Sequence, residues 1–393
     1  MNFIMDIQSI RQNTKGLSGK FFFNNAGSSL MPQTVVESMI DYFNQEEQWG
    51  GYEVADRNSQ LLESFYEETS KLIHCKPSNI AFATSSTDAY AKALSSIIFK
   101  DGDCIITTIN DYISNQITFI SLQKKLNVKV IRVKNLPNNE LDLEDLENLI
   151  REYHPKLVAV THIPTNSGLI QNVEAVGKIC RQYDIIYLVD ASQSVGQMVV
   201  DVQKINCDFL TATGRKFLRG PRGTGFLYVS DKILEQNYAP LLLDMRGAHW
   251  TEYNDYELIN TAKRFEHWET SFGSLLGLLE AVKYANAIGL EHIEIYNRKL
   301  AETLRQNLEN NGFKIMDKGM NLSSIVTFCE HNGDLDRIQK VLKENHVFFS
   351  MSYKKSALID FTNKHINGVV RLSPHYFNTL EEVERVSQIL ESI

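Results

Sequence analysis

Cysteine is scarce in this chain of 393 residues, and the few cysteines present are far apart in the sequence. The five are Cys75, Cys104, Cys180, Cys207 and Cys329, and no two of them form a CxxC pair. Because zinc sites and disulfide frameworks have recognisable cysteine spacings, this pattern indicates neither. We therefore expect no metal centre and a reduced, cytoplasmic protein.

Long apolar runs are also missing, and negative charge exceeds positive charge. No segment is apolar for long enough to span a bilayer. The N-terminal residues MNFIMDIQSIRQN include the early Asp6 and lack the apolar core of a signal peptide. The net charge is -8, whereas binding to phosphate backbones requires a basic face. We expect neither a membrane nor a nucleic acid as a partner.

The chain does contain enough apolar sequence for a large core, since 43% of its residues are hydrophobic and 22% are charged. Short apolar segments alternate with amphipathic ones. The predicted strands are IAFA, DCIITT, VKVIRV, KLVAVTHI, 185–189 and 208–213, and the helices between them include 113–125, 143–153 and 173–183. Strands separated by such helices predict an α/β fold with a mostly parallel sheet flanked by helices.

The pattern changes beyond residue 229. Residues 244–265 are polar, aromatic and irregular, which predicts a surface or interface excursion. A long helix over 272–288 is expected to bridge to a smaller α+β unit, with predicted helices 290–310, 335–345 and 380–389 and strands at SSIVTFC, VFFSM and GVVRLS. We assign residues 20–260 to a large domain, 1–19 and 285–393 to a small domain, and 261–284 to a connecting helix region.

Polar side chains follow five of the predicted strands. The groups are Ser86 and Thr87, Asp111 and Tyr112, residues 162–166, residues 190–193 and residues 213–216. The carboxyl ends of parallel strands meet at one edge of a sheet, where ligands bind in such folds. Five polar clusters at five strand ends therefore predict a single binding site.

Two charged residues in this set indicate a cofactor. Lys216 follows the strand FLTAT, and Asp190 follows the strand IIYLV. Pyridoxal 5'-phosphate needs a lysine that forms a Schiff base and an acid beside its ring nitrogen. Crowding by Arg215, Arg219 and Arg222 favours a neutral, nucleophilic lysine. A lone lysine is more often a solvated surface group, and Asp190 could be a simple strand-end acid.

Other residues could complete such a site, although most also have a structural interpretation. Ser86 and Thr87, at a predicted helix start, could bind the phosphate or cap the helix. Gln193 could hydrogen-bond the ring hydroxyl. Tyr112 could stack on the ring or lie in the core. Arg371, at a strand end, could clamp a substrate carboxylate or form an exposed salt bridge.

The segment FFFNNAGSSLMP ends a buried apolar run abruptly. It could be a plain strand-to-helix turn, with Pro32 in the first turn of the next helix. It could also be a loop that brings the backbone close to a small ligand. On the second interpretation we predict that Asn25 contacts the substrate.

The motifs VDASQSVGQ and TATGRKFLRGPRGTGFLYV closely resemble the fold-type I pyridoxal phosphate enzymes of the class V aminotransferase family. That family includes cysteine desulfurases, selenocysteine lyases, isopenicillin N epimerase-like proteins and sulfoxide C–S lyases of ergothioneine synthesis. The resemblance extends from about residue 22 to the C-terminus. It implies a large cofactor-binding domain, a smaller α+β C-terminal domain, and a homodimer with its active site at the subunit interface.

The resemblance also implies a role for each motif residue. Lys216 resembles the Schiff-base lysine, while Asp190 and Gln193 resemble the partners of the ring nitrogen and ring oxygen. The other implied contacts are Ser86, Thr87, Thr213 and Arg215 with the phosphate, Asn166 near the ring hydroxyl, Tyr112 over the ring, Arg371 with the substrate carboxylate, and Thr270 or Ser271 with the phosphate in the partner subunit. The segment RFEHWETS departs from the common RFExGT spacing.

Two departures from the family pattern bear on the reaction. Desulfurases carry a histidine over the ring in a segment resembling EHHxN, whereas this chain reads DYISN, with Tyr112 in its place. They also need a nucleophilic cysteine ahead of the carboxylate arginine, and residues 350–371 contain none. The nearest, Cys329, lies on an apolar strand and is expected in the core. Both departures disfavour a persulfide-forming desulfurase.

We therefore predict a lyase that uses pyridoxal 5'-phosphate for β-elimination from a small, sulfur-bearing amino acid. In this scheme Lys216 removes the Cα proton as general base. A class V aminotransferase and an amino-acid epimerase remain alternatives, and a cysteine desulfurase is less favoured. The non-enzyme alternative is a catalytically silent protein that binds the cofactor for a structural or regulatory purpose.

Overall fold

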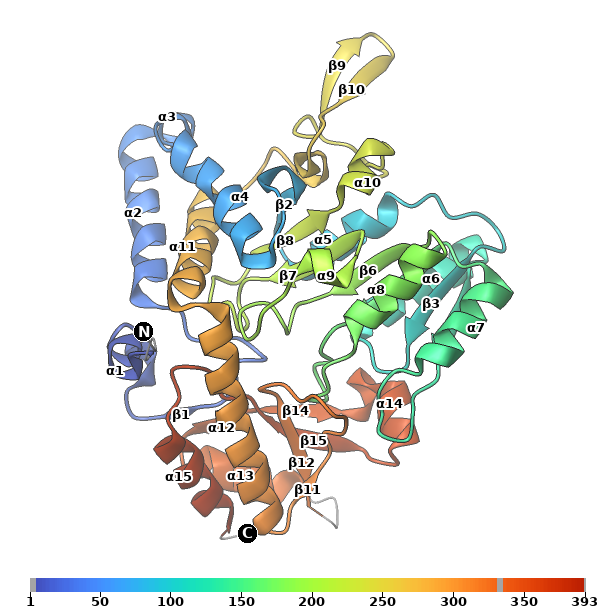
Figure 1. Cartoon of the computed structure of the whole chain (residues 1–393). Helices are drawn as coiled ribbons and strands as arrows, with labels where there is room; N and C mark the ends of the chain where they lie inside the picture. Colours follow the sequence, from blue (N-terminus) through green and yellow to red (C-terminus); the bar gives the residue numbers. More distant parts are fainter. Residues whose placement is uncertain (1–4, 331–334, 392–393) are drawn as a thin grey trace.

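A seven-stranded sheet forms the centre of the larger part of the molecule (Figure 1). The computed structural model describes residues 5–330 and 335–391. The strand order is β2-β8-β7-β6-β5-β3-β4. The strands are β2 (Ile80–Ala83), β3 (Cys104–Thr108), β4 (Lys129–Val133), β5 (Leu157–Thr161), β6 (Ile186–Asp190), β7 (Phe209–Thr213) and β8 (Gly225–Val229). Only β8 pairs antiparallel with its neighbours, so the predicted α/β fold with a mostly parallel sheet is confirmed.

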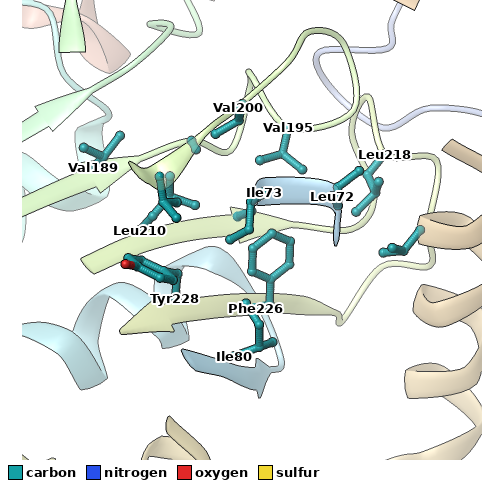
Figure 2. Close-up of a cluster of buried hydrophobic side chains, with 14 of the residues drawn as sticks. Leu72, Ile73, Ile80, Val189, Val195, Val200, Leu210, Leu218, Phe226 and Tyr228 are labelled. Atoms are coloured by element: carbon teal, nitrogen blue, oxygen red, sulfur yellow. The ribbon is translucent and has the colours of Figure 1, made fainter. Parts of the chain in front are cut away.

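The strands of this sheet are buried on both faces, which explains their continuous apolar runs. Every residue of β5, β6 and β7 is buried. On one face, Ile73 at the end of α4 (Ser59–Ile73) lies beside Phe226 of β8, and Leu72 and Leu218 belong to the same cluster (Figure 2). Burying one such side chain contributes roughly 1.5–3 kcal/mol to folding.

The first twelve helices along the chain include those that cover the sheet, and several of the twelve were predicted from their apolar periodicity. They are α1 (Ile7–Gln12), α2 (Gln33–Trp49), α3 (Gly51–Arg57), α4, α5 (Ser86–Ser95), α6 (Ile113–Leu126), α7 (Leu143–Tyr153), α8 (Val173–Gln182), α9 (Val202–Ile205), α10 (Asp231–Glu235), α11 (Phe272–Ile288) and α12 (Leu290–Asn310). Side-chain caps set several starts. The Asp142 carboxylate, for example, accepts from two backbone N–H groups at the start of α7.

The helix predicted over 272–288 exists as α11, but it packs against α2 and α4 of the larger part. Gly289 then adopts φ 89°, a conformation that favours glycine. The next helix, α12, carries the chain into the smaller part (Figure 1). The connection that sequence analysis assigned to α11 is therefore made by α12.

The smaller part is an antiparallel sheet of order β11-β12-β15-β14 with helices on it. Its elements are β11 (Lys314–Ile315), β12 (Val326–Cys329), α13 (Leu335–Glu344), β14 (Ser350–Tyr353), α14 (Leu358–Asn363), β15 (Gly368–Leu372) and α15 (Leu380–Glu391). The N-terminal strand β1 (Phe21–Phe22) pairs in parallel with β13 (Val347–Phe348). Phe23 then enters the core of the smaller part, which ties the chain start to it.

The segment predicted as an irregular excursion contains a hairpin, formed by β9 (Ala248–Glu252) and β10 (Asp255–Leu258). It projects from the body of the molecule (Figure 1), and Trp250 at 81% exposure is typical of its side chains. Short 3-10 turns occur at Lys15–Leu17, Pro77–Asn79, Ala262–Phe265 and Lys354–Ser356. Among the described residues, none of the helices combines the length and apolarity that crossing a bilayer requires.

Candidate active site

A cleft lies at the carboxyl ends of the parallel strands, and all five polar clusters singled out in the sequence contribute to it. It holds about 540 Å³ of empty space, part of it open to solvent. Its walls are formed by Ser85, Ser86, Thr87, Tyr112, Asn115, Thr161, Ile163, Thr165, Asp190, Ser192, Gln193, Thr213, Arg215 and Lys216. Residues up to 131 positions apart therefore meet in one site, because the parallel strands end at the same edge of the sheet.

Lys216 is buried in this cleft, and burial lowers the pKa of its ammonium to about 7. The negative charge of Asp190 opposes this shift, and the positive charges of Arg215 and Arg371 reinforce it. Lys216 Nζ lies 5.8 Å from the ring centroid of Tyr112. Near neutral pH a large fraction of Lys216 is consequently the free amine, the form that attacks a carbonyl carbon.

Arg219, one of the arginines expected to depress the lysine pKa, has a structural role instead. Its Nε donates to the Leu30 carbonyl at 2.8 Å and its Nη2 to the Thr14 hydroxyl at 2.6 Å. Its guanidinium carbon lies 4.6 Å from the ring centroid of Phe377, which is cation–π geometry. Burial, rather than the arginine cluster, is thus the main cause of the Lys216 shift.

Asp190 ends β6 and is held in place by two donors. The Ser192 backbone N–H donates to Oδ1 at 3.0 Å, and the Asn115 amide donates to Oδ2 at 3.2 Å. Gln193, three residues further on, donates to the Ala26 carbonyl and to the Thr165 hydroxyl. Within the described residues, its buried Oε1 has no hydrogen-bond partner, so that oxygen can accept from a ligand.

The start of α5 forms one end of the cleft. Ser85 is the N-cap, because its hydroxyl accepts from the Asp88 N–H at 3.1 Å. The Ser86 hydroxyl accepts from Ser192 at 2.7 Å and donates to Thr211 at 3.0 Å. The capping interpretation therefore applies to Ser85, while Ser86 and Thr87 face the cleft. Unpaired N–H groups at a helix start favour an anion such as phosphate.

Gly225 lies directly behind this turn, in close contact with its backbone. A Cβ atom at this position would lie 2.4 Å from the Ala212 carbonyl oxygen and 3.1 Å from the Ser86 nitrogen. A side chain would push the turn out of place, so glycine is required by the close approach of β8 to the start of α5. Thr213 and Arg215 line the same end, and Arg215 Nη1 donates to the Gly27 carbonyl.

The loop after β5 places Thr165, rather than Asn166, on the cleft wall. The Thr165 hydroxyl accepts from both Gln193 and Arg371. The Asn166 amide points to the smaller part instead and donates to Asp360 of α14 at 2.8 Å. The structure thus does not bring Asn166 to the cleft, and a one-residue displacement in the loop separates the two positions.

Arg371, on β15, lies behind Thr165 and is not itself among the residues that form the cleft walls. Its Nη1 donates to the Thr165 carbonyl at 2.9 Å and also to the hydroxyl. Burial lowers the pKa of Arg371 to about 10, and the positive charge of Arg215 adds to this shift. Nε is buried and has no hydrogen-bond partner among the described residues. The Arg371 side chain is buried, so it does not form the exposed salt bridge that was the alternative interpretation.

Two residues that were predicted to contact a ligand, Asn25 and Thr270, lie outside the cleft of this chain. Asn25 is fully buried, its amide donating to the Ser373 carbonyl at 2.7 Å and its oxygen accepting from Ser29 at 2.6 Å. Its polar atoms are engaged in this turn, so it does not line the cleft. Thr270 lies next to a different hollow and donates to the His267 carbonyl at 3.1 Å, and Ser271 caps α11.

Sequence reasoning assigned no individual role to four polar residues of the cleft, although two of them, Thr165 and Ser192, lie in the polar groups 162–166 and 190–193 that it singled out. Asn115 belongs to the segment DYISN, so its spacing after Tyr112 was a usable signal. Ser192 lies between Asp190 and Gln193 and directly follows a strand end. Thr161 and Thr165 flank the end of β5 and have no distinguishing pattern of their own. The four residues are Asn115, Thr161, Thr165 and Ser192.

Comparison with known proteins places this geometry in a family. The model of the aminotransferase class-V family matches residues 21–386, nearly the whole chain. The chain belongs to the class V aminotransferase family. Among class V relatives, a protein from Pyrococcus abyssi named probable cysteine desulfurase is 32% identical, covering 98% of this chain and 97% of its own.

Another class V relative, from Methanothermobacter thermautotrophicus, has the same name and is 28% identical over 99% of this chain and 98% of its own. The apo structure of a cysteine desulfurase from Thermococcus onnurineus is also 28% identical. It superposes with a TM-score of 0.91 and covers 100% of this chain and 98% of its own. The α/β architecture is therefore that of fold-type I class V enzymes.

The cofactor of this class V enzyme is pyridoxal 5'-phosphate, and the cleft fits it. Lys216 would supply the amine that links to its aldehyde, and Asp190 would supply the acid beside its ring nitrogen. The orphaned Gln193 oxygen is a free acceptor facing the same cleft. Gly225 lets β8 pass close behind the start of α5, where backbone N–H groups would favour a phosphate.

Proposed function

We propose that this class V enzyme is a lyase that cleaves the Cβ–S bond of a small, sulfur-bearing amino acid by β-elimination. The observation that carries the proposal is the make-up of the cleft: a buried lysine with a pKa near 7, an acid, an arginine behind Thr165, and no cysteine on its walls. All five cysteines lie within the described residues. Persulfide formation needs a nucleophilic thiol, whereas elimination does not.

The thiols of the chain are poorly suited to that nucleophilic role. Cys104, Cys180, Cys207 and Cys329 are buried, and Cys75 is half-buried beside a different cleft at the amino ends of β6 and β7. Burial raises the pKa of Cys75 to about 12 and that of Cys104 to about 11, and it raises the other three as well. A thiol with a raised pKa stays protonated, and the thiolate is the nucleophile.

Lys216 carries the proton transfers of the proposed reaction. Bound cofactor supplies an electron sink that stabilises negative charge at the substrate Cα. Lys216 accepts the Cα proton, the Cβ–S bond breaks, and the sulfur leaves with the bonding electron pair. Lys216 returns the proton to the departing sulfur, which leaves as hydrogen sulfide from cysteine, as a thiol from a thioether and as a persulfide from cystine. One water then hydrolyses the unsaturated product to pyruvate and ammonia, so atoms and charge balance.

Arg371 gives the site its preference for amino acids. A planar guanidinium binds a carboxylate with two parallel hydrogen bonds. Thr165 fixes the guanidinium through Nη1, and Thr165 is in turn bound by Gln193. The carboxylate clamp is therefore connected to the residue beside the cofactor ring. Tyr112 also lines the cleft, with its ring near Lys216.

A second candidate is cysteine desulfurase, because two relatives that span almost the whole chain carry that name. In this chain the sulfur would then pass to a thiol of another molecule. Aminotransferase and epimerase activities need the same Cα proton transfer and differ only in where the proton is returned. A silent cofactor-binding protein would change its spectrum on adding amino acids and release no product.

A panel of amino acids separates these candidates. Cysteine, cystine, a thioether amino acid and alanine are each incubated with the holoenzyme, and pyruvate, ammonia, sulfide, alanine and new keto acids are measured together. Elimination predicts pyruvate and ammonia in equal amounts from sulfur-bearing substrates only. Lys216→Ala should lose activity and the visible absorbance of lysine-linked cofactor, while exposed Lys178→Ala keeps both. Full activity in Lys216→Ala would contradict the proposal.

We also propose that the enzyme is a homodimer that acts in the cytoplasm and completes its phosphate site across the interface. The proposal is supported by Thr270, whose hydroxyl lies outside the cleft of its own subunit. Thr270→Val should weaken cofactor binding, whereas Thr303→Val on α12 should not. A monomeric mass in solution with full cofactor affinity would contradict it.

A further inference from the structure

A second buried carboxylate, Asp111, lies close to Asp190 and has no role in the site described above. It follows β3 and is 8% exposed. Donors from five residues converge on its two oxygens: the hydroxyls of Thr107 and Thr161, the side-chain amides of Asn115 and Gln116, and the Tyr112 backbone N–H. An ionised carboxylate offers about four lone-pair sites, so these donors occupy it fully.

Such a donor set identifies Asp111 as a charged acceptor. Burial raises the pKa of Asp111 and the nearby charge of Asp190 adds to this rise, while the hydrogen bonds from Thr161, Asn115 and Gln116 offset only part of it. A carboxylate that accepts several hydrogen bonds is stabilised in its charged form. The two threonine hydroxyls can also accept, but the N–H groups of Tyr112, Asn115 and Gln116 can only donate. These three N–H groups favour the charged form of Asp111 next to the cofactor cleft.

Asn115 connects this charge to Asp190. Its amide nitrogen lies 3.0 Å from Asp111 Oδ1 and 3.2 Å from Asp190 Oδ2. A side-chain amide carries two hydrogens, so one nitrogen serves both carboxylates. The Tyr112 backbone N–H donates to Asp111 Oδ1 at 2.7 Å, which fixes the residue whose ring faces Lys216.

We propose that Asp111 is a positioning residue for the cofactor. Through Asn115 it orients Asp190 toward the ring nitrogen, through the Tyr112 backbone it places the covering ring, and its charge favours a positively charged cofactor. The inference depends on the cofactor and not on which amino acid is the substrate.

The charged and titratable groups around Asp111 come from four elements. Asp190 of β6 is the second negative charge. Arg132 of β4 binds the Gln116 oxygen at 3.0 and 2.7 Å instead of a carboxylate. Burial and the two carboxylates raise the pKa of Tyr90 on α5, so Tyr90 is neutral. Lys216, after β7, feels the charge of Asp190. Removing the Asp111 charge leaves the protonated cofactor less stabilised.

Asp111→Asn tests the proposal with readouts that need no substrate. The holoenzyme is titrated with pH while the visible absorbance of the lysine-linked cofactor is recorded, and cofactor affinity is measured separately. The midpoint of the absorbance change should fall by about one pH unit, because a nearby negative charge that favours the protonated form is lost. The dissociation constant of the cofactor should rise about tenfold, since a shift of one pH unit corresponds to a tenfold change in an equilibrium constant.

Two further variants complete the test. Asp208→Asn removes another buried carboxylate, one that accepts from Tyr187 N–H at the amino end of the same sheet, and it should change neither readout. Asn115→Ala keeps the charge but breaks the link, so it should weaken cofactor binding with a smaller midpoint change. A wild-type midpoint and affinity in folded Asp111→Asn would overturn the proposal. If Asp111→Asn does not fold, unchanged affinity in Asn115→Ala would overturn it.

Discussion

At the scale of single residues, the reactivity expected of the site depends on the burial of Lys216, which shields its amine from water. Burial is the largest cause of its lowered pKa, with Arg215 and Arg371 adding to it and Asp190 opposing it. An ammonium of ordinary pKa would be almost fully charged at neutral pH and unable to attack an aldehyde. The same burial suits the lysine to accept and return a proton near pH 7.

The lowered pKa predicts how fast the apo-protein captures its cofactor. The rate of lysine–cofactor linkage should rise with pH and reach half its maximum near pH 7, because only the free amine reacts. Stopped-flow absorbance at a series of pH values measures this rate. A free lysine of ordinary pKa in solution is the control and should still be accelerating above pH 9. A rate that keeps rising in the same way in the apo-protein would contradict the assignment.

Arg371 is expected to act on substrate binding. Arg371→Lys keeps the positive charge but loses the planar fork, so KM for the amino acid should rise about tenfold or more. Steady-state kinetics give KM and kcat separately, and kcat should change less. The matched control is Arg298→Lys, an exposed residue paired with Glu294, which should leave both constants unchanged. An unaltered KM in Arg371→Lys would exclude the carboxylate clamp.

At the scale of elements, the strand-to-helix turn at the start of α5 is positioned by the strand behind it. Gly225 begins β8, and any Cβ there meets the Ala212 carbonyl and the Ser86 nitrogen. Gly225→Ala should weaken cofactor binding and lower the melting temperature together, because the turn and the sheet shift as one. Isothermal titration and thermal unfolding measure the two effects.

The control for this substitution is Gly51→Ala, at the exposed start of α3, where a Cβ meets nothing closer than 3.8 Å. Alanine has the higher helix propensity, so Gly51→Ala should leave stability equal or slightly higher. Normal cofactor affinity in Gly225→Ala would show that the position of the turn does not depend on a glycine at residue 225.

Elements with a strong period were predictable from sequence, and those defined by distant partners were not. The periodic segments gave α7 and α8 to within about a residue, since one face of each helix is apolar. The hairpin β9–β10 was missed because exposed strands carry no buried alternation. The pairing of β1 with β13 has no local signal, since its partners are over 300 residues apart.

The residues of the candidate site show the same distinction between local sequence patterns and contacts with distant residues. The lysine and its acid could be placed because each follows an apolar strand. Asn166 was chosen from a loop motif, and a shift of one residue puts Thr165 on the cleft wall instead. Asn25 was inferred from a turn whose polar atoms are engaged by Ser373 and Ser29. Side-chain direction in loops is set by tertiary contacts, which a linear pattern does not contain.

At the scale of the whole molecule, two buried histidines make stability depend on pH. Burial lowers the pKa of His162 to about 4 and that of His375 well below its usual value. Both are neutral in the folded protein, whereas the unfolded chain binds their protons below about pH 6.5. The unfolded state is therefore favoured as pH falls, and stability should be lost between about 6.5 and 4.

The predicted loss from His162 alone is about 3 kcal/mol between those pH values. His162→Gln should flatten the pH dependence of the melting temperature in this window, even if it lowers stability at pH 7. The control is His249→Gln on the exposed hairpin, which should leave the slope unchanged. A melting temperature of wild-type protein that is constant from pH 7 to 4 would rule out this account.

The most direct test of the central claim is the ratio of pyruvate to alanine formed from cysteine by the holoenzyme. Elimination breaks the Cβ–S bond together with loss of the Cα proton and leads to pyruvate and ammonia. Transfer of sulfur to a thiol leaves alanine. We predict pyruvate and sulfide as the main products, with no sulfur adduct on any of the five cysteines by intact-protein mass spectrometry. Alanine as the main product, with a persulfide on the chain, would contradict the account.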